Sequence, residues 1–224
     1  MVSTPVAPKI WRHTPEAQAA VDAKWATLRK RKAWDESKPR TIESVRRQYL
    51  ALNGGKGRTV HFAHLDELCV QKHAETGITL YKGRIVLRGN RVFDEYGYAA
   101  IFSEQSSSSS QSIVANFIDA IARLPGNAGM EADAQSAYTQ APLDDNDTHI
   151  RVILPRHTLP TKHQKLETQA HEGKVVYRLR LALEGHPRSG YYWEKYSHSK
   201  LRKCGFEKVP GLSLIHISEP TRPE

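Results

Sequence analysis

The pattern of apolar residues predicts helices at the start of the chain. Thr14 and Pro15 provide a capping residue followed by a first-turn proline. The apolar residues after them recur at helical spacing and are Ala17, Val21, Trp25 and Leu28. A second helix is predicted to begin at Thr41 and to end before the glycine-rich run at residues 53–57. Residues 1–57 are therefore predicted to form a helical lead-in.

Strand character follows, between about residues 59 and 92. The clearest strand is RIVLRG, residues 84–89, in which aliphatic and β-branched residues stand between arginines and a glycine ends the run. The later pattern predicts helices over 113–124 and 190–206, strands over 130–133, 148–155 and 174–183, and a loop over 157–173. This mixture of helices and strands predicts an α+β fold.

Composition argues against disorder and against a membrane span. The chain has 39% hydrophobic and 25% charged residues. No apolar run reaches the roughly 18 residues of a transmembrane helix, and the N-terminus lacks the apolar core of a signal peptide. The chain is therefore predicted to be intracellular, in a cytoplasmic particle or in the nucleus, and to have no membrane partner.

The formal charge of +9 is unevenly distributed along the chain. Residues 1–60 carry 13 Lys and Arg against 5 Asp and Glu, and residues 151–211 again carry 13 against 5. Residues 61–150 carry 6 against 12. Two basic flanks around an acidic middle are typical of a protein that holds polyanions near divalent cations, because cations replace counterions along phosphates while carboxylates bind metal.

The stretch MEADAQSAYTQAPL, residues 130–143, places Asp133 at the end of a predicted strand. A carboxylate at the end of a buried strand costs several kcal/mol unless it is paired or bound to a cation. Taken alone, the stretch is explained most simply by a capping or salt-bridged aspartate. The order of the segments around it favours a metal ligand instead.

The order in question is that of four sequence blocks: YKGRIVLRGN at 81–90, MEADAQSAYTQAPL at 130–143, RLRLALEGHPRSGYYWEK at 178–195 and LRKCGF at 201–206. In this sequence of blocks the chain resembles copia-type retrotransposon reverse transcriptases over about residues 14–210. It also resembles retroviral polymerases in the pattern D-x-x-x-A-Y-x-x-x-P-L-D. The residues that meet this pattern are Asp133, Ala137, Tyr138, Pro142, Leu143 and Asp144.

The resemblance implies a fold and a chemistry. Residues 58–211 would form the fingers and first half of the palm of a right-hand polymerase, which extends a DNA primer on an RNA or DNA template. Asp133 would be the catalytic, metal-binding aspartate, and the main-chain carbonyl of Ala134 would share its metal. The cofactor would be Mg²⁺, with Mn²⁺ as a substitute, in two-metal phosphoryl transfer.

The resemblance also assigns the residues that contact substrate. Tyr138 would lie against the sugar of the incoming deoxynucleoside triphosphate and exclude a 2′-hydroxyl. Lys82, Arg84 and Arg88 would face the triphosphate and the template, and strand alternation places them on one face. Arg188 would contact the template. The partners implied are an RNA or DNA primer-template and the remaining polymerase, ribonuclease H and integrase regions of a polyprotein.

The chain departs from the family at several positions. Glu184 stands where the family commonly has tyrosine, and Arg188, Ser189 and Gly190 replace Gln-Ala-Pro. The Tyr-x-Asp-Asp hairpin, which supplies the other metal-binding carboxylates, is absent from the sequence. Residues 212–222, LSLIHISEPTR, match a one-frame translation of a sequencing adaptor, so residues 212–224 are predicted to be an artefact. A genuine short apolar strand is the alternative.

Three functions remain open at this stage. The first is a reverse transcriptase fragment, expected to be inactive by itself because one palm aspartate cannot hold two metal ions. The second is a non-catalytic, nucleic-acid-binding remnant of such an element. The third is a basic interaction protein with no polymerase history, for which the ordered blocks would be coincidence.

Overall fold

The computed structural model describes residues 3–52, 59–72, 80–102, 112–129, 133–143, 149–169, 173–208 and 218–220. The chain divides into two compact units. Unit 1 comprises residues 1–101 and 143–186, and unit 2 comprises residues 102–142 and 187–224. The described residues form both helices and strands, which confirms the predicted α+β class.

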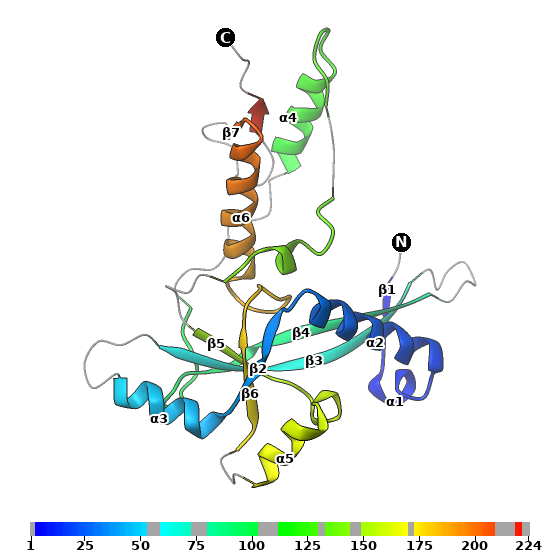
Figure 1. The fold of residues 1–224 in the computed structure, drawn as a ribbon. Coiled ribbons are helices and arrows are strands. Elements are labelled where there is room, and N and C mark those ends of the chain that lie inside the picture. The colour runs from blue at the N-terminus through cyan, green and yellow to red at the C-terminus, as the bar shows by residue number, and fades with distance from the viewer. Residues whose placement is uncertain are drawn as a thin grey trace. The chain divides into compact units, whose positions relative to one another are not determined.

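Unit 1 is built on a six-stranded sheet (Figure 1). Its strands are β1 (Ser3–Val6), β2 (Trp34–Thr41), β3 (Val60–Lys72), β4 (Leu80–Phe93), β5 (His149–Ile153) and β6 (Val175–Leu179). The hydrogen-bonded order is β1-β3-β5-β6-β2, and β4 pairs with β3 outside this path. β3 and β5 run parallel, whereas β4 is antiparallel to β3 and β6 is antiparallel to both β5 and β2.

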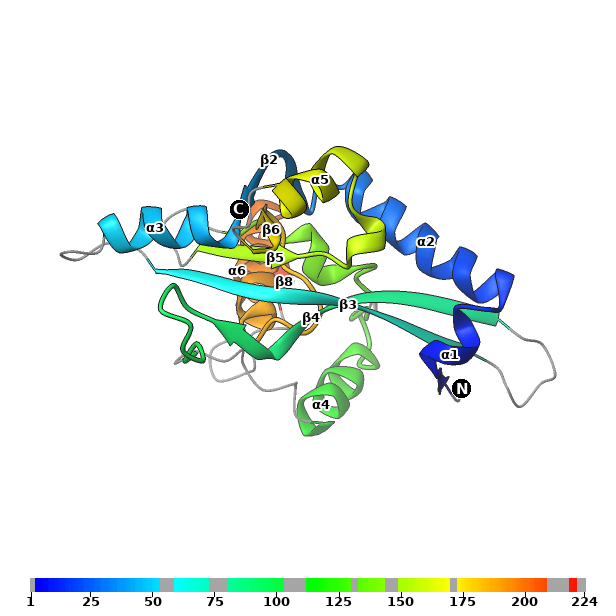
Figure 2. The ribbon, with the colours of Figure 1, turned by 90° about the horizontal axis from the view of Figure 1, so that it is seen from below.

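Two helices lie toward different ends of β3, as Figures 1 and 2 both show. α2 (Pro15–Lys30) buries its predicted apolar stripe and packs along β4. α3 (Ile42–Leu52) contributes to a buried apolar cluster under the start of β3. The cluster consists of Val45, Tyr49, Val60, Phe62, Ile153 and Val176. Both predicted helices are therefore confirmed. Each large aliphatic or phenylalanine side chain buried in this way stabilises the unit by roughly 1.5–3 kcal/mol.

A buried carboxylate on β3 ties three further segments to the sheet. Glu67 accepts a hydrogen bond from Trp25 Nε1 of α2 at 2.8 Å. It also lies 3.5 Å from Arg12, which follows α1 (Pro8–Trp11), and 2.9 Å from His157 in the 3₁₀ helix η3 (Arg156–Thr158). These contacts satisfy a group that would be costly to bury alone, and they hold α2 against the hairpin of β3 and β4.

Unit 2 contains its own helices and strands. They are α4 (Ser112–Ala122), the 3₁₀ helix η2 (Ala137–Gln140), α6 (Ser189–Lys203), β7 (Phe206–Lys208) and β8 (Ser218–Pro220). η2 packs against α6, and β7 pairs with β8. α6 ends before Gly205, whose φ of +82° suits glycine at a helix C-terminus. The predicted helices over 113–124 and 190–206 are thus confirmed to within a few residues.

Some sequence predictions need correction. The loop predicted over 157–173 contains helix α5 (Thr161–Gln169). Residues 1–57 contain β1 and β2 besides their helices. Of the strand predicted over 130–133, residues 130–132 lie outside the described part of the chain, and Asp133 lies in no strand. In the tail predicted to be an artefact, only residues 218–220 are described.

Candidate functional site

The hairpin of β3 and β4 has one covered face and one open face. On β4, Gly83, Ile85 and Leu87 are buried. Gly83 lies so close to α2 that a Cβ atom on it would come within 2.4 Å of the Ala20 carbonyl oxygen. Covering this face of the hairpin leaves the alternate residues of β4 in solvent.

The open face of β4 carries three of the predicted site residues. Lys82, Arg84 and Arg88 are all exposed, as strand alternation predicts. Arg84 Nη1 lies 3.7 Å from Glu184 Oε2, and Arg88 donates a hydrogen bond to Asp66 on β3. Glu184 therefore partly neutralises Arg84. We name Lys82, Arg84 and Arg88 the β4 basic face.

Lys24 of α2 lies close enough to the β4 basic face to interact with the charges of Lys82 and Arg84. Burial lowers the pKa of its ammonium group, the nearby Glu184 carboxylate raises it, and the cations Lys82, Arg31 and Arg84 lower it further. Positive charge is thus concentrated where α2 flanks β4. Lys24 gives no distinctive signal in the sequence, because in the helical pattern it is one of several polar residues outside the apolar stripe.

The predicted palm residues lie in unit 2. Asp133 and Ala134 are exposed, and Ser136 adopts a left-handed backbone with φ of 53° before η2 begins. The prediction that Asp133 is buried at the end of a strand, and therefore needs a cation, is wrong. An exposed carboxylate is hydrated by solvent, so it does not require a bound cation.

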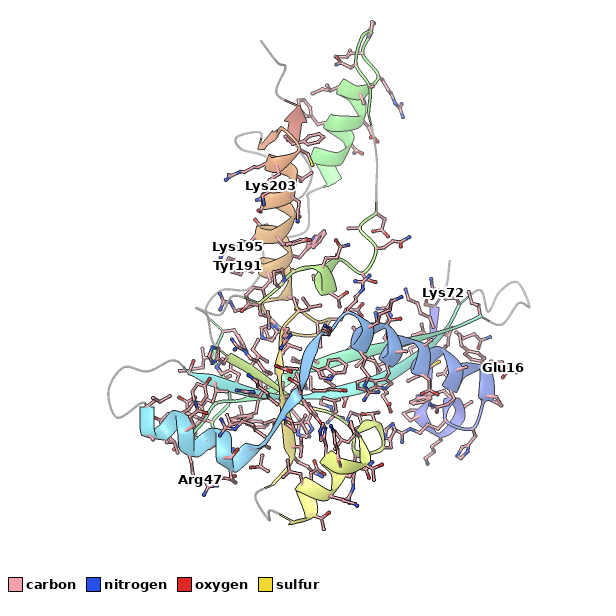
Figure 3. The ribbon with its side chains drawn as sticks, viewed as in Figure 1. Glu16, Arg47, Lys72, Tyr191, Lys195 and Lys203 are labelled. Carbon is pink, nitrogen blue, oxygen red and sulfur yellow. The ribbon has the colours of Figure 1, made fainter. Side chains whose placement is uncertain are left out.

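Tyr138 and Arg188 are held by unit 2 in different ways. Tyr138 is half-buried in η2, which packs against α6. Arg188 precedes α6, and its guanidinium carbon lies 5.0 Å from the ring centroid of Tyr191 and 5.3 Å from that of Tyr192. Figure 3 shows Tyr191 on α6. These cation–π contacts fix Arg188 against its own helix.

The described residues lack the ligand cluster that a divalent-cation site requires. They contain no cluster of three or more His, Cys, Asp or Glu side chains that could hold a metal ion. Asp133 can supply one carboxylate, and the backbone of Ala134 one carbonyl. The described part of the chain therefore does not form a complete Mg²⁺ site.

Each unit holds its own share of the predicted site residues. The β4 basic face belongs to unit 1, and Asp133, Ala134, Tyr138 and Arg188 belong to unit 2. No helix within the described ranges is long and apolar enough to cross a membrane. No family model, curated protein or solved structure matches the chain.

Proposed function

We propose that the chain is part of a copia-type reverse transcriptase, comprising the fingers and the first half of the palm of an RNA-directed DNA polymerase. The β4 basic face is the observation that carries this proposal. A strand whose one side packs on a helix and whose other side presents cations at alternate positions suits a phosphate-bearing ligand. The four ordered sequence blocks support the same assignment.

The chain's own residues have distinct tasks in this proposal. Side chains on one face of a strand recur every ~6.8 Å, so a single extended polyanion can contact Lys82, Arg84 and Arg88 in turn. Asp133 and the Ala134 carbonyl supply two ligands to Mg²⁺ or Mn²⁺. The remaining carboxylates come from a Tyr-x-Asp-Asp hairpin that this sequence does not contain.

Salt dependence of nucleic-acid binding tests the proposal. The purified chain is expected to bind a DNA-primed RNA template with little sequence preference, because phosphate contacts carry no base information. The triple variant Lys82→Gln, Arg84→Gln, Arg88→Gln should bind more weakly. It should also lower the slope of log K against log salt concentration by about 2–3, since each phosphate contact contributes roughly 0.9. Fluorescence anisotropy at several salt concentrations measures both quantities.

A charge-matched control variant distinguishes the effect of where the charge lies from the effect of the total net charge. Lys9, Lys162 and Lys165 are exposed residues of α1 and α5 in unit 1. Changing these three to Gln removes the same charge from outside the β4 basic face and should reduce the slope much less. Equal losses in the two triple variants would show that the β4 basic face is not the contact surface.

The non-catalytic remnant is the second candidate, and the described residues, which contain no complete carboxylate cluster, are compatible with it. Both candidates predict nucleic-acid binding, and they differ in catalysis by a longer chain. A chain extended through a Tyr-x-Asp-Asp hairpin should incorporate deoxynucleotides if the element encodes an enzyme. A hairpin-containing chain that binds primer-template and does not extend the primer supports the remnant.

A further inference from the structure

Glu184 is held against β4 by its backbone. The Leu87 amide donates a hydrogen bond of 2.8 Å to the Glu184 carbonyl oxygen. The next residue, Gly185, lies so close to β4 that a Cβ atom on it would come within 2.1 Å of the Leu87 carbonyl oxygen. Glu184 and β4 also belong to the same compact unit. This backbone contact therefore keeps the Glu184 side chain beside the β4 basic face.

The Glu184 carboxylate is a counter-ion that several cations share. Its Oε2 atom lies 3.7 Å from Nη1 of Arg84. Lys24 interacts with the charge of the same carboxylate and with the charges of Lys82 and Arg84. A negative charge thus stands among cations of β4 and α2, at the place where the proposed function requires a phosphate.

The ion pair between Glu184 and Arg84 is loose. The Arg84 side chain is 44% exposed and the Glu184 side chain is 37% exposed, so water competes for both charges and the pair contributes little to stability. Their separation of 3.7 Å is longer than a hydrogen bond. Arg88 differs in this respect, because it donates a hydrogen bond to Asp66. Arg84 can therefore exchange its carboxylate partner for another anion.

A phosphate group is a stronger partner for Arg84 than this carboxylate. Guanidinium groups bind phosphate oxygens through charge-assisted hydrogen bonds that are frequently bidentate. While Glu184 remains next to Arg84, however, its negative charge repels an approaching polyanion. The carboxylate therefore opposes the binding of phosphate without preventing it.

We propose that Glu184 acts as a built-in competitor of phosphate at the β4 basic face and lowers the affinity of this face for nucleic acid. The inference rests on the proposed function, since it assumes that Arg84 contacts a phosphate of the primer-template. When that contact forms, Arg84 leaves Glu184. Part of the binding free energy is then lost in separating the ion pair and in holding a carboxylate close to a phosphate.

The variant Glu184→Gln tests the inference through a gain of affinity, which a failure to fold cannot imitate. Glutamine keeps the size of the side chain and removes its charge. At low salt the variant should bind the DNA-primed RNA template about two- to fivefold more tightly than the parent. The slope of log K against log salt concentration should become steeper by up to about 0.9, because Arg84 then contributes a full phosphate contact. Fluorescence anisotropy measures both quantities.

Glu43→Gln is the matched control variant. Glu43 of α3 is an exposed carboxylate that also pairs with an arginine, since it lies 3.1 Å from Arg46. α3 and α2 lie toward different ends of β3 (Figures 1 and 2), and it is α2 that packs along β4. The control removes the same charge and should bind close to the parental affinity. Equal gains in the two variants would overturn the inference, because net charge would then explain them.

A double-variant cycle shows whether Glu184 acts through Arg84. In a chain that already carries Arg84→Gln, the change Glu184→Gln should raise affinity less than it does in the parent, because the arginine that pairs with Glu184 is gone. An equal gain with and without Arg84 would contradict competition for this arginine.

The inference and the proposed function fail in different ways. If the parent binds through the β4 basic face and Glu184→Gln binds no more tightly, the inference is wrong and the proposed function is unaffected. If the triple variant of Lys82, Arg84 and Arg88 binds no more weakly than its charge-matched control, the proposed function is wrong, and the inference is wrong with it.

Discussion

Gly185→Ala is expected to destabilise unit 1 by about 3–4 kcal/mol. Gly185 has a φ of +89°, which costs an L-residue roughly 1–2 kcal/mol. A Cβ atom there would lie 2.1 Å from the carbonyl oxygen of Leu87 on β4. The chain around residue 185 would have to move away from β4. The 2.8 Å hydrogen bond from the Leu87 amide to the Glu184 carbonyl would then be lost. Chemical denaturation measures the change.

Gly97→Ala is the matched control for this substitution. Gly97 has a φ of +90°, and the nearest atom to a Cβ placed on it is the end of the Arg46 side chain at 3.6 Å. This variant has the backbone strain without the clash, so it should lose only about 1–2 kcal/mol. If the two variants lose equal stability, the close approach of residue 185 to β4 does not hold the hairpin in place.

Tyr138→Val, made in a chain that includes a Tyr-x-Asp-Asp hairpin, is expected to relax discrimination against ribonucleotides by roughly 10- to 100-fold. In the proposed function the ring occupies the space that a 2′-hydroxyl would need. Valine opens that space and leaves the carboxylates untouched, so most deoxynucleotide incorporation should survive. Single-nucleotide incorporation with matched ribo- and deoxynucleoside triphosphates measures the ratio.

A packing role for Tyr138 predicts a different result. Truncation of a fully buried ring would cost roughly 3–5 kcal/mol and lower incorporation of both sugars alike. Because Tyr138 is only half-buried, the loss of stability should be smaller than this. A variant that loses stability and keeps the parental ratio of ribose to deoxyribose incorporation would identify Tyr138 as a packing residue.

Strong periodicity made part of the fold predictable. The stripe from Ala17 to Leu28 marked α2, and the RIVLRG run marked β4, because packing there agrees with the local pattern. β2 was missed because its sequence, WDESKPRT, is polar, contains Pro39 and does not alternate. As the last strand in the sheet order it tolerates a proline, and a register shift interrupts its pairing with β6.

The candidate sites were predictable to different extents. Alternation alone placed Lys82, Arg84 and Arg88 on one face. The prediction that Asp133 is buried was wrong. The small residues beside it suggested a strand, but Asp133 is exposed and lies in no strand. A cavity lined by Arg40, Arg151 and Arg178 had no local signal in the sequence, since its lining residues come from distant segments that only the sheet brings together.

The pairing of β2 with β6 has a consequence for biosynthesis. Trp34 pairs with Leu179, and among the strands that the structure describes β2 pairs with β6 alone. At roughly 5–20 residues per second, a ribosome needs on the order of 7–30 s to translate from one partner to the other. During this interval β2 must stay unpaired while β3 and β4 already emerge as a hairpin. The nascent chain therefore exposes β2 before β6 has been synthesised. Polar residues such as Glu36 and Lys38 keep β2 from pairing with other chains.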